Sequence, residues 1–196
     1  MSFAKHTQFW WLIRATFWFC IAATGAAAPV TLEATTVDEL LDNPKLNAKK
    51  YASYFGDFSY EFSATIQPPA TFLTRERGDC DDYAVLADFV LTKRGLGTRL
   101  IHVRLAGRVA HAVCYVSENS AYLDYNNRKF FITLAKSGPD LRDIATKVAD
   151  SLSANWTTAS EFTYSYDTRR KVMTTTISQT GGKVPAPGKP SPFHVE

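Results

Sequence analysis

Hydrophobic positions along the chain follow two different spacings, and the change comes at Gly95. Before Gly95, residues Tyr83, Leu86 and Val90 recur three or four positions apart, which is the spacing of the apolar face of an α-helix. Asp79 stands where a helix N-cap belongs, and Gly95 follows two basic residues as a helix stop signal does. The pattern therefore predicts a helix that begins after Asp79 and ends at Gly95.

Beyond Gly95, apolar and polar residues alternate one by one, as they do in half-buried strands. Four such runs are separated by short polar turns, and they cover residues 98–105, 109–116, 121–125 and 129–134. Helical spacing returns over residues 139–156, and residues 161–178 have the pattern of a hairpin around a polar turn. We expect an antiparallel meander, then a surface helix, then a hairpin.

Two short helices are predicted near the start of the chain. Residues 35–44 carry Thr36 and Glu39 in the arrangement of a capping box, and residues 46–58 form a second candidate that Gly56 would end.

The segment between these helices and Asp79 is expected to be extended or irregular over residues 59–72, because Pro68 and Pro69 disfavour regular structure. Helices first and a meander afterwards predict an α+β fold. With 196 residues, the chain suits one domain, which we place at residues 29–178, followed by a flexible Gly/Pro-rich tail at 179–196.

Residues 1–28 have the features of a signal peptide. Lys5 and Arg14 precede an uncharged run of 14 residues, 15–28, that ends in alanines. That run is shorter than the roughly 20 residues that span a bilayer, so cleavage and export to the periplasm or beyond are expected, with no stable membrane span afterwards. An uncleaved anchor is the alternative, because more apolar residues precede Arg14.

Composition restricts the classes of partner. The chain is 45% hydrophobic and 13% aromatic, as folding chains are, and its formal charge of +3 falls to +1 without residues 1–28. No basic stripe with interleaved aromatic residues is present, so nucleic acid is not an expected partner.

Export leaves two cysteines, Cys80 and Cys114, in a compartment where disulfides persist. A bridge between them is one interpretation. We disfavour it because the strand pattern over residues 109–116 points Cys114 away from His111.

A catalytic interpretation needs a base for the thiol and a third group that orients the base. Only His102 and His111 lie in the predicted domain. Asp124 lies 13 residues after His111 on the next predicted strand, within reach across a hairpin, whereas His102 has no comparable carboxylate. Cys80, His111 and Asp124 are therefore the candidate catalytic residues.

The acidic neighbours of Cys80 argue against an ionised thiol, since nearby negative charge raises a thiol pKa. A helix start opposes this effect, because its free N–H groups and dipole stabilise an anion, and a neighbouring His⁺ adds to it. The backbone N–H of Cys80 is then a candidate oxyanion donor. A second donor is needed, and Gln67 is one candidate.

Three motifs in order, "RGDCDDYA", "HAVCYV" and "YLDYN", resemble the transglutaminase-like superfamily, and more narrowly its exported bacterial cysteine proteinases. The resemblance covers about residues 66–127. It implies a papain-like core in which the nucleophile helix packs on the antiparallel meander. It also implies acyl transfer through a thioester, with Cys80 as nucleophile, His111 as base and Asp124 as orienting acid.

The resemblance leaves the acceptor open between water and an amine. True transglutaminases have a tryptophan just upstream of the nucleophile, and here only Trp156 remains after processing. That absence favours hydrolysis of a protein or peptide substrate over cross-linking. A non-catalytic secreted binding module of the same fold is a further alternative.

No cofactor is expected. The acids beside Cys80 raise calcium as an alternative, since some exported relatives bind it near the nucleophile, but helix capping alone explains an acidic first turn. Zinc is less favoured because no close ligand pair is present. The basic residues 169–171 are expected to be solvated surface.

Overall fold

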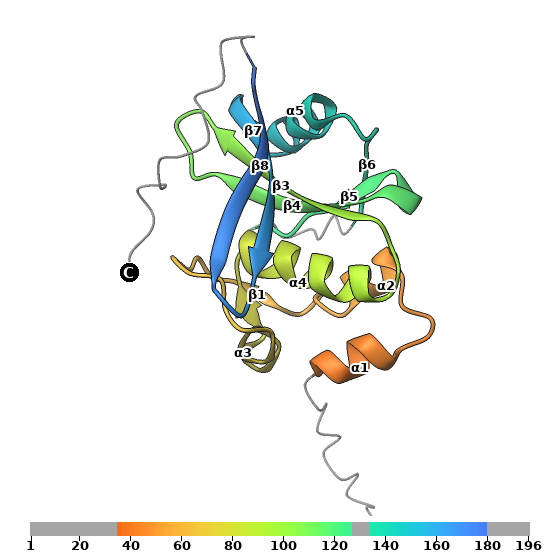
Figure 1. Cartoon of the computed structure of the whole chain (residues 1–196). Helices are drawn as coiled ribbons and strands as arrows, with labels where there is room; N and C mark the ends of the chain where they lie inside the picture. Colours follow the sequence, from red (N-terminus) through yellow and green to blue (C-terminus); the bar gives the residue numbers. More distant parts are fainter. Residues whose placement is uncertain (1–34, 127–133, 180–196) are drawn as a thin grey trace, which may run out of the picture. The chain divides into compact units, whose positions relative to one another are not determined.

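Six antiparallel strands form one sheet in the order β6-β5-β4-β3-β7-β8 (Figure 1). The computed structural model describes residues 35–126 and 134–179, all within the unit Glu33–Glu196. In chain order the strands are β3 (Thr98–Leu105), β4 (His111–Val116), β5 (Ala121–Leu123), β6 (Ala135–Lys136), β7 (Trp156–Ser165) and β8 (Arg170–Ser178). The predicted meander is present in β3, β4 and β5, and the predicted hairpin in β7 and β8.

Helices cover both faces of the sheet (Figure 1). Helix α4 (Cys80–Lys93) packs on one face, and α5 (Leu141–Ser151) packs on the other. The core is therefore divided in two: Leu100, Cys114 and Leu123 lie in the α4 cluster, whereas Val113 and Tyr115 lie in the α5 cluster. Helices and an antiparallel sheet packed in this way confirm the predicted α+β fold.

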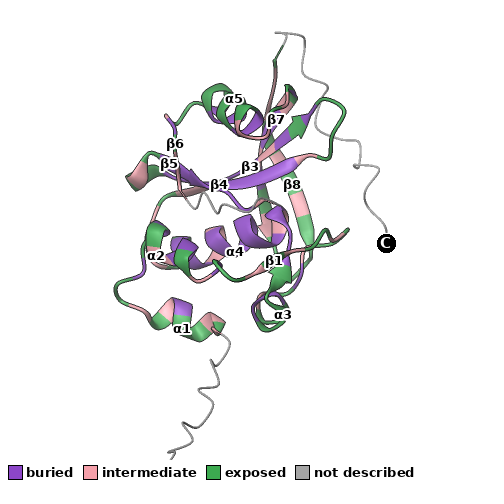
Figure 2. Cartoon of the chain, turned by 180° about the vertical axis from the view of Figure 1, so that it is seen from behind, coloured by how far each residue is buried: buried purple, intermediate pink, exposed green. Residues whose placement is uncertain are grey.

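Strand β4 is buried along its whole length because it lies between the two helices (Figure 2). Side chains of a strand alternate between the two faces, and both faces of this strand are covered by a helix. Burial on both sides explains why the run "HAVCYV" is apolar throughout instead of alternating.

The first helices are shorter than the sequence suggests. α1 (Val37–Asp42) has the predicted capping box between Thr36 and Glu39. α2 (Ala48–Ser53) has Asn47 as its N-cap, and it ends at a C-cap on Tyr54, before Gly56.

The region around the two prolines differs from the prediction. Residues Pro69–Arg75 form helix α3, with Pro68 at the N-cap. A proline in the first turn costs a helix nothing, since its missing N–H has no intrahelical partner there and its φ is already helical. The prolines that were expected to exclude regular structure begin a helix instead.

A short parallel pair, β1 (Ser59–Tyr60) and β2 (Arg77–Gly78), lies on either side of α3 in the sequence. It brings the chain back beside the start of α4.

Several predictions fall outside the described residues. These are the signal peptide at 1–28, the strand at 129–133 and the tail from residue 180 onward. None of the helices within residues 35–126 and 134–179 has the length and apolar content of a membrane span.

Candidate active site

Cys80 is the first residue of α4 and is 6% exposed. Asp79 is the N-cap, as predicted, and its carboxylate accepts hydrogen bonds from the backbone N–H groups of Asp81 and Asp82. The N–H of Tyr83 bonds to the carbonyl of Asp79. The cap therefore satisfies the second and third N–H groups and leaves that of Cys80, the first, directed out of the helix end.

The acids on either side of Cys80 serve the fold. The Asp82 carboxylate accepts from the backbone N–H of Gln67 at 2.6 Å, from its side chain at 2.8 Å and from the N–H of Asp79 at 3.1 Å. Gly78 has to be glycine, because a Cβ there would lie 2.5 Å from an Asp82 oxygen and 2.7 Å from the ring of Phe72. In the "RGDCDD" motif, Asp79 and Asp82 therefore form a capping box, and Gly78 leaves the space that the Asp82 side chain needs.

Burial leaves these carboxyls harder to ionise. Desolvation raises the pKa of Asp79 to about 6, although the backbone N–H of Ser63 opposes the shift, and desolvation also raises the pKa of Asp82. The helix end therefore carries less negative charge near pH 6 than three ordinary aspartates would.

His111 and Asp124 are brought together where the neighbouring strands β4 and β5 begin and end, since His111 is the first residue of β4 and Asp124 follows β5. His111 Nε2 lies 2.7 Å from Asp124 Oδ1, with both side chains buried. Asn126 donates to the same carboxylate oxygen at 3.0 Å, which orients the carboxylate further. With Nε2 engaged, the ring has Nδ1 free for another partner.

That partner is the thiol of Cys80. Burial alone would lower the pKa of His111, but the charge of Cys80 and hydrogen bonds to Asp124 and Cys80 raise it to about 10. The structure thus brings the three candidate residues together, with His111 between the side chains of Cys80 and Asp124.

His102 does not join this group. It packs against Phe162, with 6.4 Å between ring centroids, and desolvation followed by the charge of Lys171 lowers its pKa to about 4. A histidine that stays neutral beside an ammonium is a packing residue here.

Both described cysteines are free. Cys114 is fully buried in the α4 cluster, where desolvation and then Asp88 raise its pKa well above the usual value. Cys114 thus packs in the core and forms no bridge with Cys80.

Gln67 is occupied elsewhere. Its amide nitrogen donates to Asp82 and to the carbonyl of Arg77, and its oxygen accepts from Arg75. The side chain braces the helix start and has no donor left for a substrate. Tyr60 lies beside the thiol instead. The sequence carries no motif for this residue, and its position follows from the pairing of β1 with β2.

Lys171 also corrects an expectation. Instead of being solvated, its Nζ lies 2.9 Å from an Asp81 oxygen and 4.2 Å from the centroid of the Phe162 ring. A cation from β8 thus neutralises the one acid of this helix start that has no capping role.

The acids beside Cys80 do not fit a calcium ion as they are arranged here. Calcium takes six to eight oxygen ligands, whereas the oxygens of Asp79 and Asp82 accept backbone and amide hydrogen bonds and Asp81 pairs with Lys171. Within residues 35–126 and 134–179, no group of three or more His, Cys, Asp or Glu side chains is placed to hold a metal.

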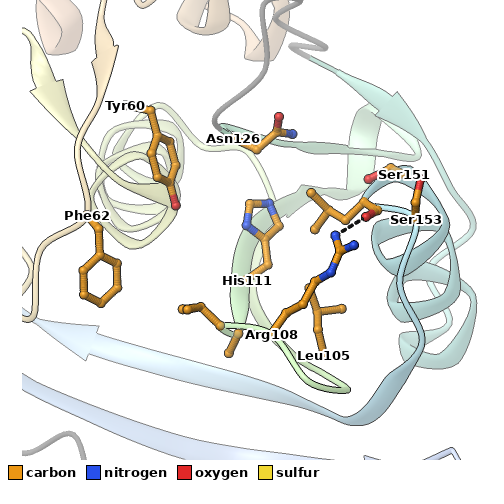
Figure 3. A pocket seen from close by; sticks show the side chains of 11 residues that line it. Tyr60, Phe62, Leu105, Arg108, His111, Asn126, Ser151 and Ser153 are labelled. Atoms are coloured by element: carbon orange, nitrogen blue, oxygen red, sulfur yellow. Dashed lines mark hydrogen bonds between the residues drawn. The ribbon is translucent and has the colours of Figure 1, made fainter.

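A cavity of about 500 Å³ opens onto His111 (Figure 3). Tyr60 and Phe62 lie on one side of it, and Leu105, Arg108 and the end of α5 lie on the other. Phe62 and Val109 are 63% and 69% exposed, so the rim is more apolar than an ordinary surface. Arg108 is held in place by a 2.6 Å hydrogen bond to the carbonyl of Leu152.

Comparison with known proteins finds a family match. The model of a family described as transglutaminase-like domain matches residues 33–135. No curated protein matches.

Among solved structures, calcium-bound LapG of Legionella pneumophila is 21% identical, with a TM-score of 0.41, over 63% of this chain and 68% of that chain. The EGTA-treated form of LapG from the same organism is also 21% identical, with a TM-score of 0.42, over 63% and 67% of the two chains. A further structure of that LapG is 19% identical, with a TM-score of 0.37, over 60% and 80%.

Proposed function

Because the chain belongs to the transglutaminase-like domain family, we propose that it is an exported cysteine hydrolase that cleaves peptide or amide bonds. Cys80 is the nucleophile, His111 the base and Asp124 the orienting acid. The observation that carries this proposal is the position of His111, buried between the thiol of Cys80 and the carboxylate of Asp124.

The reaction follows from these positions. The Cys80 thiolate attacks the substrate carbonyl carbon, and the electron pair of the C=O bond moves to oxygen. When the C=O bond re-forms, the C–N bond breaks and the amine leaves with the proton of His111, so a thioester remains. Neutral His111 then takes a proton from water, whose oxygen attacks the thioester, and the acid product leaves as the thiolate is restored.

The cavity supports a polypeptide substrate. A volume of about 500 Å³ holds several side chains, and the exposed Phe62 and Val109 offer apolar contacts at its rim. We propose that apolar side chains flank the bond that is cut. Replacing Phe62 with alanine should then raise KM more than it lowers kcat.

Export is part of the proposal and rests on residues 1–28. Residues 29–178 are the proposed mature domain. We propose that the protein works in the periplasm or outside the cell on a protein or peptide.

Two other functions are outcomes of the test. A transglutaminase would pass the acyl group to an amine, and a binding module would have no reactive thiol. Trp156 lies in the α5 cluster and donates to Thr146, so no tryptophan of the described residues stands beside Cys80. That placement favours water as the acceptor.

The test combines thiol labelling with cleavage. We expect iodoacetamide to alkylate Cys80 rapidly at pH 6, and His111→Ala to slow it to the rate of a free thiol. A casein or peptide library should be cleaved by the wild type and by Cys114→Ser, but not by Cys80→Ser. Slow labelling that His111→Ala does not change would contradict the proposal, and amine incorporation without hydrolysis would favour a transglutaminase.

A further inference from the structure

The proposed reaction needs two donors for the carbonyl oxygen as it becomes negative, and the helix start supplies one of them. The N–H of Cys80 is the backbone donor that the Asp79 cap leaves free. A single donor leaves much of the available stabilisation unused, since each oxyanion donor contributes about 10²–10³-fold in rate. The second donor has to lie beside Cys80 and face the cavity.

The backbone fixes Tyr60 beside the nucleophile. Tyr60 pairs with Gly78 in the parallel β1–β2 ladder, two residues before Cys80. The next N–H, that of Glu61, bonds to the carbonyl of Gly78 at 2.8 Å. The Glu61 side chain is paired in turn with Arg75 at 2.8 Å. These contacts hold the backbone at Tyr60 against Gly78 and so fix the position of its Cα relative to the start of α4.

Aromatic packing fixes the ring. Tyr60 stacks on Tyr125, with ring centroids 5.7 Å apart and an interplanar angle of 21°, and Tyr125 stacks on Tyr83 of α4. Tyr125, the residue after Asp124, therefore lies between the ring of Tyr60 and that of Tyr83 in α4. Figure 3 shows Tyr60 at the wall of the cavity that His111 also lines, with its hydroxyl directed into the cavity.

The hydroxyl interacts with both parts of Cys80. Burial and then the charge of Cys80 raise the pKa of Tyr60 far above its usual value, while the backbone N–H of Cys80 acts in the opposite direction. The phenol therefore keeps its proton at neutral pH. A neutral phenol that borders the Cys80 N–H is a donor aimed at the place where a substrate oxygen would lie.

We propose that Tyr60 is the second oxyanion donor of the hydrolase proposed above. In the free protein its hydroxyl lies against the N–H of Cys80. When the C–S bond forms and the C=O electron pair moves to oxygen, that oxygen accepts from the Cys80 N–H and from the Tyr60 O–H. Both donors keep their protons, and the electron pair returns to the C–O bond as the amine leaves.

Two reactions of the same thiol separate this role from simple support of the site. Alkylation by iodoacetamide needs the thiolate but creates no oxyanion, whereas acylation by p-nitrophenyl acetate passes through one. Both reactions begin with the thiolate of Cys80, so a loss of thiolate lowers the two rates alike, whereas the loss of an oxyanion donor lowers the acylation rate alone. We therefore measure both rates in the wild type, in Tyr60→Phe and in Tyr54→Phe.

The matched control is Tyr54, another half-buried tyrosine, whose hydroxyl accepts a 2.9 Å hydrogen bond from Asn43. We expect Tyr60→Phe to slow acylation by about 10²-fold while alkylation changes by about threefold or less. Tyr54→Phe should leave both rates unchanged. Tyr60→His, which keeps a ring donor, should recover part of the acylation rate.

The proposal would be overturned if Tyr60→Phe lowered both rates in parallel, left acylation unchanged or accelerated it. Acceleration would mean that the phenol blocks the site. Failure of the proposed function looks different: the wild type itself would then be alkylated without any burst of p-nitrophenolate.

Discussion

Two cysteines lie on the α4 side of the sheet, yet the structure gives them different environments. Cys80 is the first residue of α4, and its polar neighbours include His111 and the hydroxyl of Tyr60. Cys114 is fully buried among the apolar side chains of the α4 cluster, and its thiol lies 3.9 Å from the carbonyl oxygen of Tyr115.

The two environments differ in their polar groups. A helix start and an imidazolium are the groups that stabilise thiolates in proteins, whereas desolvation and then the charge of Asp88 raise the pKa of Cys114. Burial is almost the same for both, at 6% and 0% exposure, so burial alone does not distinguish a nucleophile from a core residue. The polar groups around each sulfur do.

The largest expected effect is the difference in reactivity between the two sulfurs. Iodoacetamide should modify Cys80 in the native protein at least about 10³-fold faster than Cys114, which is reached only when the α4 side of the core opens. Peptide mapping by mass spectrometry after timed quenching measures both rates. Similar alkylation rates for Cys80 and Cys114 would contradict the proposed difference in reactivity.

The second prediction concerns Asp124, which accepts the hydrogen bond that orients His111. Asp124→Ala leaves His111 without its acceptor, so we expect proposed hydrolysis to fall by about 10²–10⁴-fold. The matched control is Asp88→Asn, which alters a partly buried carboxyl that acts on Cys114 and accepts a 2.6 Å hydrogen bond from the Thr98 hydroxyl. The control should keep the labelling rate of Cys80, and equal losses in both variants would mean that Asp124 acts only through stability.

Serine substitutions at the two cysteines should have opposite effects: the one at Cys114 should lower stability, and the one at Cys80 should abolish activity. Cys114→Ser places a hydroxyl in an apolar core, and we expect it to lower the free energy of unfolding by about 1–3 kcal/mol while leaving the labelling rate of Cys80 intact. Cys80→Ser should cost less stability, because a hydroxyl at a helix start finds polar partners. Urea denaturation of the two variants and the wild type provides the comparison.

His111 should link stability to pH, with the sign set by its raised pKa. A folded pKa of about 10, above the usual 6.5, means that the folded state holds the proton more tightly. The stabilisation is complete below about pH 6.5 and is lost as pH rises through about 10. The difference in urea midpoint between wild type and His111→Gln should therefore narrow between pH 7 and 10, and a constant difference would contradict an imidazolium in the folded protein.

The smallest effect concerns Lys171 and calcium. Because Lys171 already pairs with Asp81, about 1 mM calcium should change the melting temperature of the wild type by about 1 °C or less compared with EGTA. Lys171→Met frees that carboxylate and should increase the response. A large calcium effect in the wild type would show that a metal displaces the lysine.

Local sequence signals predict the parts of the candidate site that depend on interactions between residues close together in the sequence. The cap at Asp79, the helix that starts at Cys80 and the strand that starts near His111 all follow from residue spacing and capping chemistry. The approach of Asp124 to His111 was also predictable, because a hairpin limits how far apart its two strands can lie.

The remaining parts depend on contacts between distant segments. Helix α3 was missed because proline was read as a breaker, although it is favourable at the first helical position. Tyr60 and Lys171 carry no motif. The first reaches the thiol through a two-residue parallel ladder and the second through strand order, and neither can be deduced from spacing.

The pairing of Lys171 with Asp81 joins residues 90 positions apart, and this separation sets an order of events for a chain made from its N-terminus. A chain that has emerged only as far as β5 has Cys80, His111 and Asp124, but β3 still lacks β7 along one edge. An open edge strand invites pairing with other chains, and contacts this distant form late. The β7–β8 hairpin, which follows the candidate site in the sequence, therefore covers the open edge of β3 and supplies the cation that pairs with Asp81 in the same step.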